Sequence, residues 1–270
     1  MRPCKRTGYF LVVTLWVLCA AHSTSTGNVP PPESSPPAAQ SKASSSKVWV
    51  GRYAAYEKFL RTAVIERATS VGSSQHVFFK PGGLVAGGSL KAEAYKLEIA
   101  GYQLDRVLSL DMVPPTVEVR SNGEPVSLQL WVDNTRLLSQ IRATNVSPPD
   151  PARWNAQLQR AYVFENLVAN LDPNEGTPVV DPLWNLIILD HSRGFTDTLA
   201  QPYEIGKTLN QIDRAFFNQV KKLNKATVRR AIRDLVDAAA IDALFMRRDN
   251  LVKAFEKLAT ERGANQVFTR

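Results

Sequence analysis

The chain has 270 residues, 44% of them hydrophobic, which is enough to bury one sizeable core or two modest ones. Its formal net charge is +8, and removing Arg2, Lys5 and Arg6 from the count leaves +5 for the rest of the chain. This excess is modest and contains no long run of basic residues, so we expect no nucleic-acid partner.

Residues 1–21 have the layout of a signal peptide. Basic residues precede an apolar run from Tyr9 to Leu18, which is short for a bilayer-spanning helix, and small residues follow it. An uncleaved anchor and lipid attachment at Cys19 are the alternatives. Because Cys4 and Cys19 both lie here, cleavage would leave no thiolate nucleophile, cysteine metal site or disulfide. We expect an exported protein, periplasmic or secreted, with no transmembrane span in the mature chain.

Residues 22–47 are rich in Pro, Ser and Ala, so we predict a disordered tether that buries no core. If the signal segment is not cleaved, this tether would hold the following residues off a membrane. Beyond it, we predict an N-lobe over residues 48–133 and a C-lobe over residues 134–270.

The N-lobe is expected to combine strands with one long helix. The predicted elements are a helix over 48–62, extended pieces over 63–68 and 76–80, and a helix over 89–109 with Ser89 as its N-cap. A glycine-rich connection separates the second extended piece from the long helix. Two further strands flank Asn122-Gly123, which is typical of a β-hairpin turn.

The C-lobe is expected to be mostly helical. A polar, proline-containing passage over 133–151 is predicted to join the lobes, and a helix follows over 154–170. Short strands are predicted over 178–181 and 186–189, and only helices after residue 204. Strands segregated from helices in this way predict the α+β class.

Four charged residues stand at informative places along these elements. Lys80 ends the apolar strand VFFK, and Glu98 lies eighteen residues later on the long helix. Asp172 follows the helix over 154–170, and Asp190 follows the strand LIIL, again eighteen residues later. Lysine, helix glutamate, loop aspartate and strand-end aspartate follow the order in which a protein-kinase fold supplies its phosphate-binding and metal-binding groups.

Two longer segments resemble a known family. KAEAYKLEIAGYQLDRVLSLDMVPPTVEV and VFENLVANLDPNEGTPVVDPLWNLIILDHSRGF are similar to motifs of bacterial proteins related to the secretory-pathway casein kinases and four-jointed-type kinases. The C-terminal ALFMRRDNLVKAFEKL is similar to the helix that closes these domains. The chain is also remotely similar to the HipA toxin kinases and the lipid kinases. The resemblance implies a two-lobed protein-kinase-like fold, with a small strand-rich N-lobe and a mostly helical C-lobe.

The resemblance also implies roles for individual residues. Lys80 would bind the phosphates of ATP or another nucleoside triphosphate, and Glu98 would pair with it. Asp172 would be the catalytic carboxylate, and Asp190 would hold Mg²⁺ or Mn²⁺. Thr177 stands where the family has a metal-binding Asn, and Asn174 is a substitute ligand for the same ion.

Three departures from the family leave the activity open. Pro173 and Asn174 replace an Arg-His pair, Thr177 replaces an amide ligand, and the turn that would cover the nucleotide has only Gly72. We therefore consider an atypical kinase acting on a protein or sugar hydroxyl, and a catalytically impaired pseudokinase that binds nucleotide or protein. A metal-dependent hydrolase using Asp172, Asp190 and His191 is a weaker third hypothesis. We expect a monomer.

Each residue also has a simpler interpretation. Lys80 is typical of a solvated strand end, and Asp172-Pro173-Asn174 is typical of a turn. Glu93 competes with Glu98 for the same role on the helix. Asp190 could cap a turn, although a carboxylate that follows four apolar residues normally needs a partner or a metal.

Overall fold

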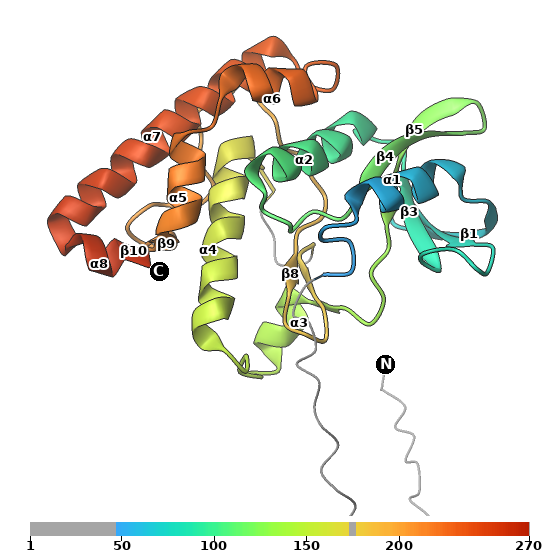
Figure 1. Cartoon of the computed structure of the whole chain (residues 1–270), viewed down its shortest axis with the longest axis horizontal. Coiled ribbons are helices and arrows are strands. Elements are labelled where there is room, and N and C mark those ends of the chain that lie inside the picture. The colour runs from blue at the N-terminus through green and yellow to red at the C-terminus, as the bar shows by residue number, and fades with distance from the viewer. Residues whose placement is uncertain (1–46, 173–176, 270) are drawn as a thin grey trace, which may run out of the picture. The chain divides into compact units, whose positions relative to one another are not determined.

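The computed structural model describes residues 47–172 and 177–269 (Figure 1). The predicted signal peptide, almost all of the predicted tether, and Asn174 lie outside the described residues. A search of the helices in the described part for one that is long and apolar enough to cross a bilayer finds none.

The first half of the described chain forms a five-stranded antiparallel sheet. Its strands are β1 (Ile65–Val71), β2 (Ser74–Phe79), β3 (Gly87–Lys91), β4 (Thr116–Ser121) and β5 (Glu124–Leu130), in the order β1-β2-β3-β5-β4. The predicted hairpin at Asn122-Gly123 is confirmed: it joins β4 to β5, and both residues have positive φ, as a tight primed turn requires.

Strand β3 corrects the prediction for residues 81–94. The sequence predicts a glycine-rich connection and a helix that begins at Ser89, but residues 87–91 pair with β2 on one side and β5 on the other. Gly88 is fixed by packing, because a Cβ there would lie 2.7 Å from Cδ1 of Leu128 and 3.0 Å from the Gln129 carbonyl oxygen. Glycines that look like a flexible connection are therefore positions where two neighbouring strands approach closely.

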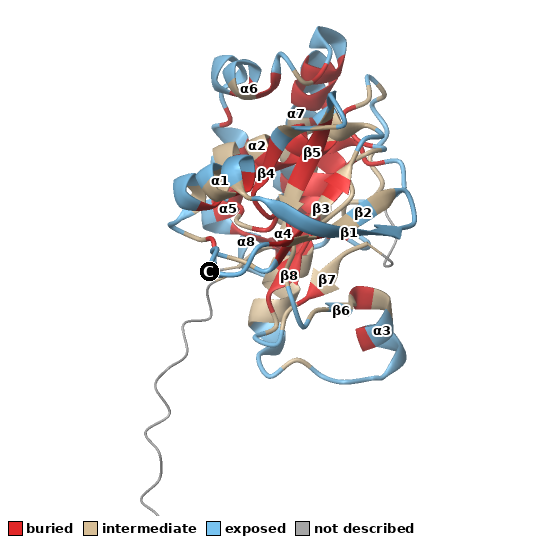
Figure 2. Cartoon of the chain, turned by 90° about the vertical axis from the view of Figure 1, so that its right-hand side faces the viewer, coloured by how far each residue is buried: buried red, intermediate tan, exposed pale blue. Residues whose placement is uncertain are grey.

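Helices α1 (Tyr53–Thr62) and α2 (Tyr95–Leu108) pack on this sheet. A buried cluster joins Tyr56 and Leu60 of α1 to residues of β2, β4 and β5, and Figure 2 shows buried residues concentrated where these elements meet. Asp105, fully buried in α2, accepts hydrogen bonds from the backbone N–H groups of Met112 and Val113 and so fixes the connection to β4. Burial raises the pKa of Asp105 to about 6, despite these bonds.

The second half is mostly helical, as predicted. Its elements are β6 (Arg136–Leu137), α3 (Leu138–Ala143), α4 (Pro151–Val168), β7 (Val179–Val180), β8 (Leu186–Ile187), β9 (Ile212–Asp213), α5 (Arg214–Lys221), α6 (Lys225–Ile232), α7 (Ala238–Arg262), α8 (Ala264–Val267) and β10 (Phe268–Thr269). Asp150, Asp213 and Asn224 each cap a helix by accepting a backbone N–H bond. Two elements, β6 and α3, lie in the passage predicted as a connection, and β9 and β10 were not predicted.

The α+β class is confirmed by this segregation of an antiparallel sheet from the later helices. Helix α2 belongs to the predicted N-lobe, but its Ala100, Leu104 and Leu108 pack in the same buried cluster as α4 and α7. The boundary between residues 133 and 134 stays a prediction, since nothing in the structure tests it.

Arg247 of helix α7 is hydrogen-bonded to the end of helix α4 and to the segment 196–198. Its side chain is fully buried; Nε donates to the Leu167 carbonyl and Nη1 donates to the carbonyls of Thr196 and Thr198. The end of α4 and the segment after residue 195 are therefore fastened to the same point of α7.

We predict that Arg247→Leu lowers the free energy of unfolding by about 3 kcal/mol, because one buried and two partly buried carbonyl groups lose their donor. Urea denaturation of the full chain measures this change. The matched control Arg230→Leu, at an exposed position of α6, should change stability by less than about 0.5 kcal/mol. Equal effects of the two substitutions would contradict the assignment.

Candidate functional site

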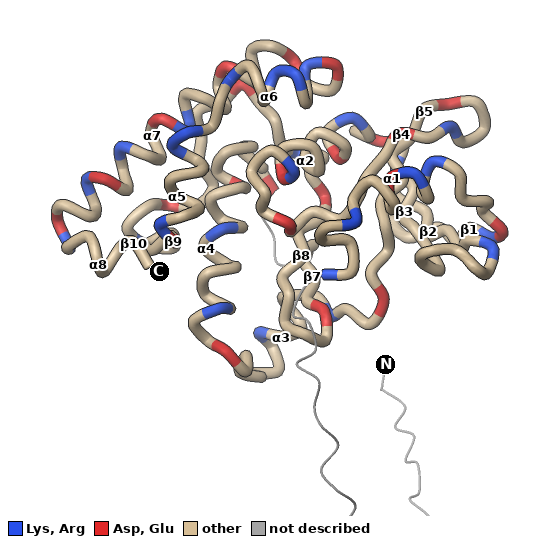
Figure 3. The backbone as a smooth tube through the Cα atoms, viewed as in Figure 1, with Lys and Arg blue, Asp and Glu red and all other residues tan. Residues whose placement is uncertain are grey.

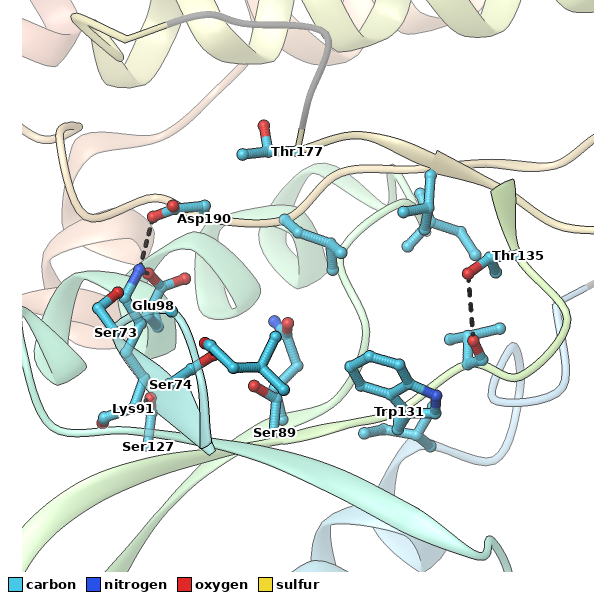
Figure 4. Close-up of a pocket in the computed structure, with 18 of the residues that line it drawn as sticks. Ser73, Ser74, Ser89, Lys91, Glu98, Ser127, Trp131, Thr135, Thr177 and Asp190 are labelled. Atoms are coloured by element: carbon cyan, nitrogen blue, oxygen red, sulfur yellow. Dashed lines mark hydrogen bonds and ion pairs between the residues drawn. The ribbon is translucent and has the colours of Figure 1, made fainter. Parts of the chain in front are cut away.

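A cavity of about 430 Å³ lies between the sheet and the segment from Thr177 to Asp190. The lining residues come from the β1–β2 turn, the inner face of β3 and β5, helix α2, and the strands β7 and β8. Figure 4 shows Lys91, Glu98 and Asp190 together at one end of this cavity and Trp131 and Thr135 at the other. The charged side chains of the cavity are thus gathered at one end.

Lys91 is the centre of the charged end. Its Nζ lies 2.8 Å from Oε1 of Glu98 and 2.6 Å from Oδ1 of Asp190, so one ammonium group bridges two carboxylates. Although burial alone would lower the pKa of Lys91, Glu98 and Asp190 raise it. The lysine therefore carries a full positive charge at neutral pH.

Asp190 sits at a special backbone position. Its φ is +60°, which places it in the left-handed region directly after the apolar run 186–189. The Ser192 hydroxyl and backbone N–H both donate to its Oδ1, at 2.6 Å and 3.3 Å. Partial burial alone would raise the pKa of Asp190, but the bonds from Lys91 and Ser192 lower it to about 2. The carboxylate is ionised throughout the physiological range.

His191 contacts the second carboxylate oxygen of Glu98, the one that does not face Lys91. The His191 backbone N–H donates to Oε2 of Glu98 at 3.1 Å, and the His191 ring nitrogen Nδ1 lies 3.6 Å from the same oxygen. Burial would raise the pKa of Glu98, but His191 and Lys91 together lower it. Both oxygens of Glu98 are thus engaged, one by Lys91 and one by His191, which fixes the direction of the carboxylate.

His191 fits only because residue 101 is a glycine. The His191 side chain is fully buried, and a Cβ built on Gly101 would lie 2.6 Å from its Cγ and 2.7 Å from its Nδ1. Helix α2 can therefore approach the segment after Asp190 closely enough for Glu98 to reach Lys91. The imidazole does not line the cavity.

The structure corrects the predicted pairing of Lys80 with Glu98. Lys80 follows β2, is exposed, and is not among the residues that line the cavity; Lys91 of β3 makes the pair instead. Sequence reasoning missed Lys91 because it missed β3. The available signal was the alternation Ser89-Leu90-Lys91, in which a buried leucine lies between two half-buried polar residues.

Three of the other predicted residues line the cavity: Glu98, Thr177 and Asp190. Asp172 lies just after α4, exposed and outside the lining. Its loop nevertheless runs beside the segment after Asp190, because the Leu171 N–H donates to the Arg193 carbonyl at 3.3 Å. Asn174 lies outside the described residues.

The side chains at the charged end fit a divalent cation whose coordination is completed by oxygens of a bound anion. No three His, Cys, Asp or Glu side chains gather into a metal site among the described residues. Within the described residues Oδ2 of Asp190 has no hydrogen-bond partner, and Thr177 lines the same cavity. Mg²⁺ typically uses one or two carboxylates together with substrate phosphate oxygens. The charged end therefore suits a cation that arrives with a phosphorylated ligand.

Comparison of the sequence with protein-family models and with curated proteins finds no match. Comparison of the structure finds the crystal structure of the Helicobacter pylori proinflammatory kinase CtkA, with 9% sequence identity and a TM-score of 0.51. The match covers 75% of this chain and 98% of that chain. The chain thus has the two-lobed kinase-like fold that the sequence predicts. The narrower resemblance to the secretory-pathway casein kinases stays a prediction.

We predict that Gly101→Ala lowers the free energy of unfolding by about 1–3 kcal/mol, because the added methyl group meets the His191 ring. The urea midpoint of the full chain measures this change. His191→Ala removes the obstacle, so Gly101→Ala should cost clearly less in that background. Additive effects in the double-mutant cycle would contradict the close contact.

Proposed function

We propose that this chain is a phosphotransferase that uses a nucleoside triphosphate and a divalent cation to phosphorylate a hydroxyl group. The observation that carries the proposal is the bridge from Lys91 to Glu98 and Asp190 at one end of a cavity of about 430 Å³. A kinase-like fold supports it, because in such folds a strand lysine, a helix glutamate and a strand-end aspartate serve phosphate and metal binding.

Each side chain has a distinct role in this proposal. Lys91 binds the phosphates as a positive charge, and Glu98 holds Lys91 in direction because its own carboxylate is fixed by His191. Asp190 binds the cation through its available oxygen, with Thr177 and Asn174 as further proposed ligands. The cation, Mg²⁺ or Mn²⁺, would supply neutralisation of phosphate charge.

Phosphate binding would replace part of the present ion pair. Lys91 now neutralises Asp190 directly, and a triphosphate with its cation would separate the two while keeping each charge compensated. Asp172 is proposed to orient the attacking hydroxyl group and accept its proton. The β1–β2 turn lines the same cavity, and its Ser73 would offer a hydroxyl and a backbone N–H to phosphate oxygens.

A second candidate is a binding module of the same fold that does not transfer phosphate. Two features favour it. Oδ1 of Asp190 is already engaged by Lys91 and Ser192, and Thr177 offers a hydroxyl where a kinase of the resembled family has an amide. A hydroxyl is a weaker ligand for a hard cation than an amide oxygen, so nucleotide binding could persist without efficient transfer.

The location and the acceptor are also proposals. The basic and apolar layout of residues 1–21 supports export to the periplasm or the medium, with membrane tethering if the segment is not cleaved. We propose a protein or glycan hydroxyl as the acceptor, on the resemblance to the secretory-pathway casein kinases and four-jointed-type kinases.

We predict that ATP with Mg²⁺ or Mn²⁺ raises the thermal midpoint of the full chain, and that Lys91→Ala and Asp190→Asn abolish the rise. Lys80→Ala is the matched control: this lysine is exposed outside the cavity, so the rise should persist. Because Lys91→Ala also leaves Glu98 without its cation, each shift is measured against the same variant without nucleotide.

Transfer of labelled γ-phosphate decides between the two candidates. Metal-dependent transfer to the chain itself or to a serine-containing protein such as casein, lost in Asp190→Asn, supports the phosphotransferase. Nucleotide binding without transfer or hydrolysis supports the binding module. No midpoint shift with any nucleotide, or a shift that Lys80→Ala removes and Lys91→Ala keeps, would overturn both.

A further inference from the structure

Three neighbouring strands place polar side chains in one row across the sheet. In the register of the strands, Gln129 of β5 lies opposite Ser89 of β3 on one side and Thr116 of β4 on the other. Ser89 and Gln129 line the cavity, whereas Thr116 is 1% exposed and does not. Gln129 is therefore anchored on its buried side and open to the cavity on the other.

The orientation of the Gln129 amide is fixed by a chain of hydrogen bonds. The Thr116 hydroxyl donates its only proton to the Pro114 carbonyl at 2.9 Å, and a carbonyl can only accept. Towards Gln129 the Thr116 oxygen can therefore only accept, and it lies 2.9 Å from Nε2. The hydrogen-bond network thus assigns the amide nitrogen to the Thr116 side. Oε1 takes no part in this bond and can only accept, while Nε2 keeps one further proton.

Oε1 of Gln129 is available to a ligand. Within the described residues it has no hydrogen-bond donor, and it is not among the fully buried polar atoms that lack a partner. The Ser127 hydroxyl on the same strand donates its proton to the Lys91 carbonyl at 3.2 Å, so its oxygen can only accept from a ligand. Gln129 is thus an acceptor whose orientation is set by a buried neighbour.

The place of Gln129 along the floor is set by strand geometry. Ser127, Gln129 and Trp131 line the cavity two residues apart, and Ser127 lies opposite Lys91. Alternate residues of a strand are about 7 Å apart, so Gln129 lies about one such step from the charged end. The Trp131 ring stacks on His76 at 4.0 Å between centroids, at the end away from Lys91. A nucleotide whose phosphates lie at Lys91 would extend its base past Gln129 towards Trp131.

We propose that Gln129, held by Thr116, is the residue by which this site discriminates between nucleobases, selecting a purine with a 6-amino group over one with a 6-oxo group. This inference rests on the proposed nucleotide binding. A 6-amino group donates a hydrogen bond to Oε1, whereas a 6-oxo group presents lone pairs to another acceptor. Sites built to bond one polar group reject the analogue that cannot pair with it.

Thr116 has a separable part in this selection. It does not line the cavity, but it prevents the Gln129 amide from turning over. Without the hydroxyl, the amide could present Nε2 to a 6-oxo group as well as Oε1 to a 6-amino group. Selectivity should then fall, although no side chain of the cavity has changed.

The test compares ATP with ITP, which replaces the 6-amino group by an oxo group and protonates N1. Calorimetry of the full chain with Mg²⁺ should give about 10-fold or tighter binding of ATP than of ITP. Gln129→Leu and Thr116→Val should each bring the ratio of dissociation constants close to one. The control Gln75→Leu, on the exposed side of β2, should keep the wild-type ratio.

The outcomes separate this inference from the proposed function. Equal binding of ATP and ITP by the wild-type chain, or a ratio that survives both Gln129→Leu and Thr116→Val, overturns the role of Gln129 and leaves nucleotide binding intact. Absence of binding to either nucleotide overturns the proposed function and this inference with it. If Thr116→Val proves too unstable to measure, Gln129→Leu alone decides.

Discussion

The contact between the Lys91 ammonium group and the carboxylates of Glu98 and Asp190 is the interaction on which the site depends. It joins the middle of the sheet, helix α2 and the segment after β8, which are far apart in the sequence. Charges that are buried or partly buried are costly unless they are paired, so each group requires the other two to stay in place. The arrangement therefore holds three elements together at the charged end of the cavity.

Close backbone packing makes this contact possible. Gly88 lets β3 lie against its neighbours, and Gly101 lets α2 approach the segment that carries Asp190. His191 fills the space above Gly101 and directs the Glu98 carboxylate towards Lys91. Small residues in the sheet and the helix thus set the position of the charges, even though they carry no functional group themselves.

The cavity has two chemically different ends, and this difference supports the proposed ligand. One end carries an ammonium group beside two ionised carboxylates and suits phosphate with a cation. Farther along the floor Gln129 presents a fixed acceptor, followed by Trp131, which stacks on His76. A nucleotide has charged phosphates at one end and a hydrogen-bonding aromatic base at the other. It therefore fits these two ends of the cavity better than a simple anion does.

The sequence by itself determined the α+β class and the hairpin at Asn122-Gly123, because local periodicity and turn chemistry carry that information. It also singled out Glu98 and Asp190, which both contact Lys91 in the structure. It did not determine β3, since five residues that include two glycines have a strand pattern too weak to recognise. The sequence therefore predicted Lys80 as the partner of Glu98, although Lys91 makes that contact in the structure. Only the tertiary structure decided this, because the partner of a charge depends on which strand fills the gap between β2 and β5. The orientation of Gln129 was likewise set by Thr116 on the neighbouring strand β4 and by Pro114 just before that strand, through hydrogen bonds between residues that are not adjacent in the chain.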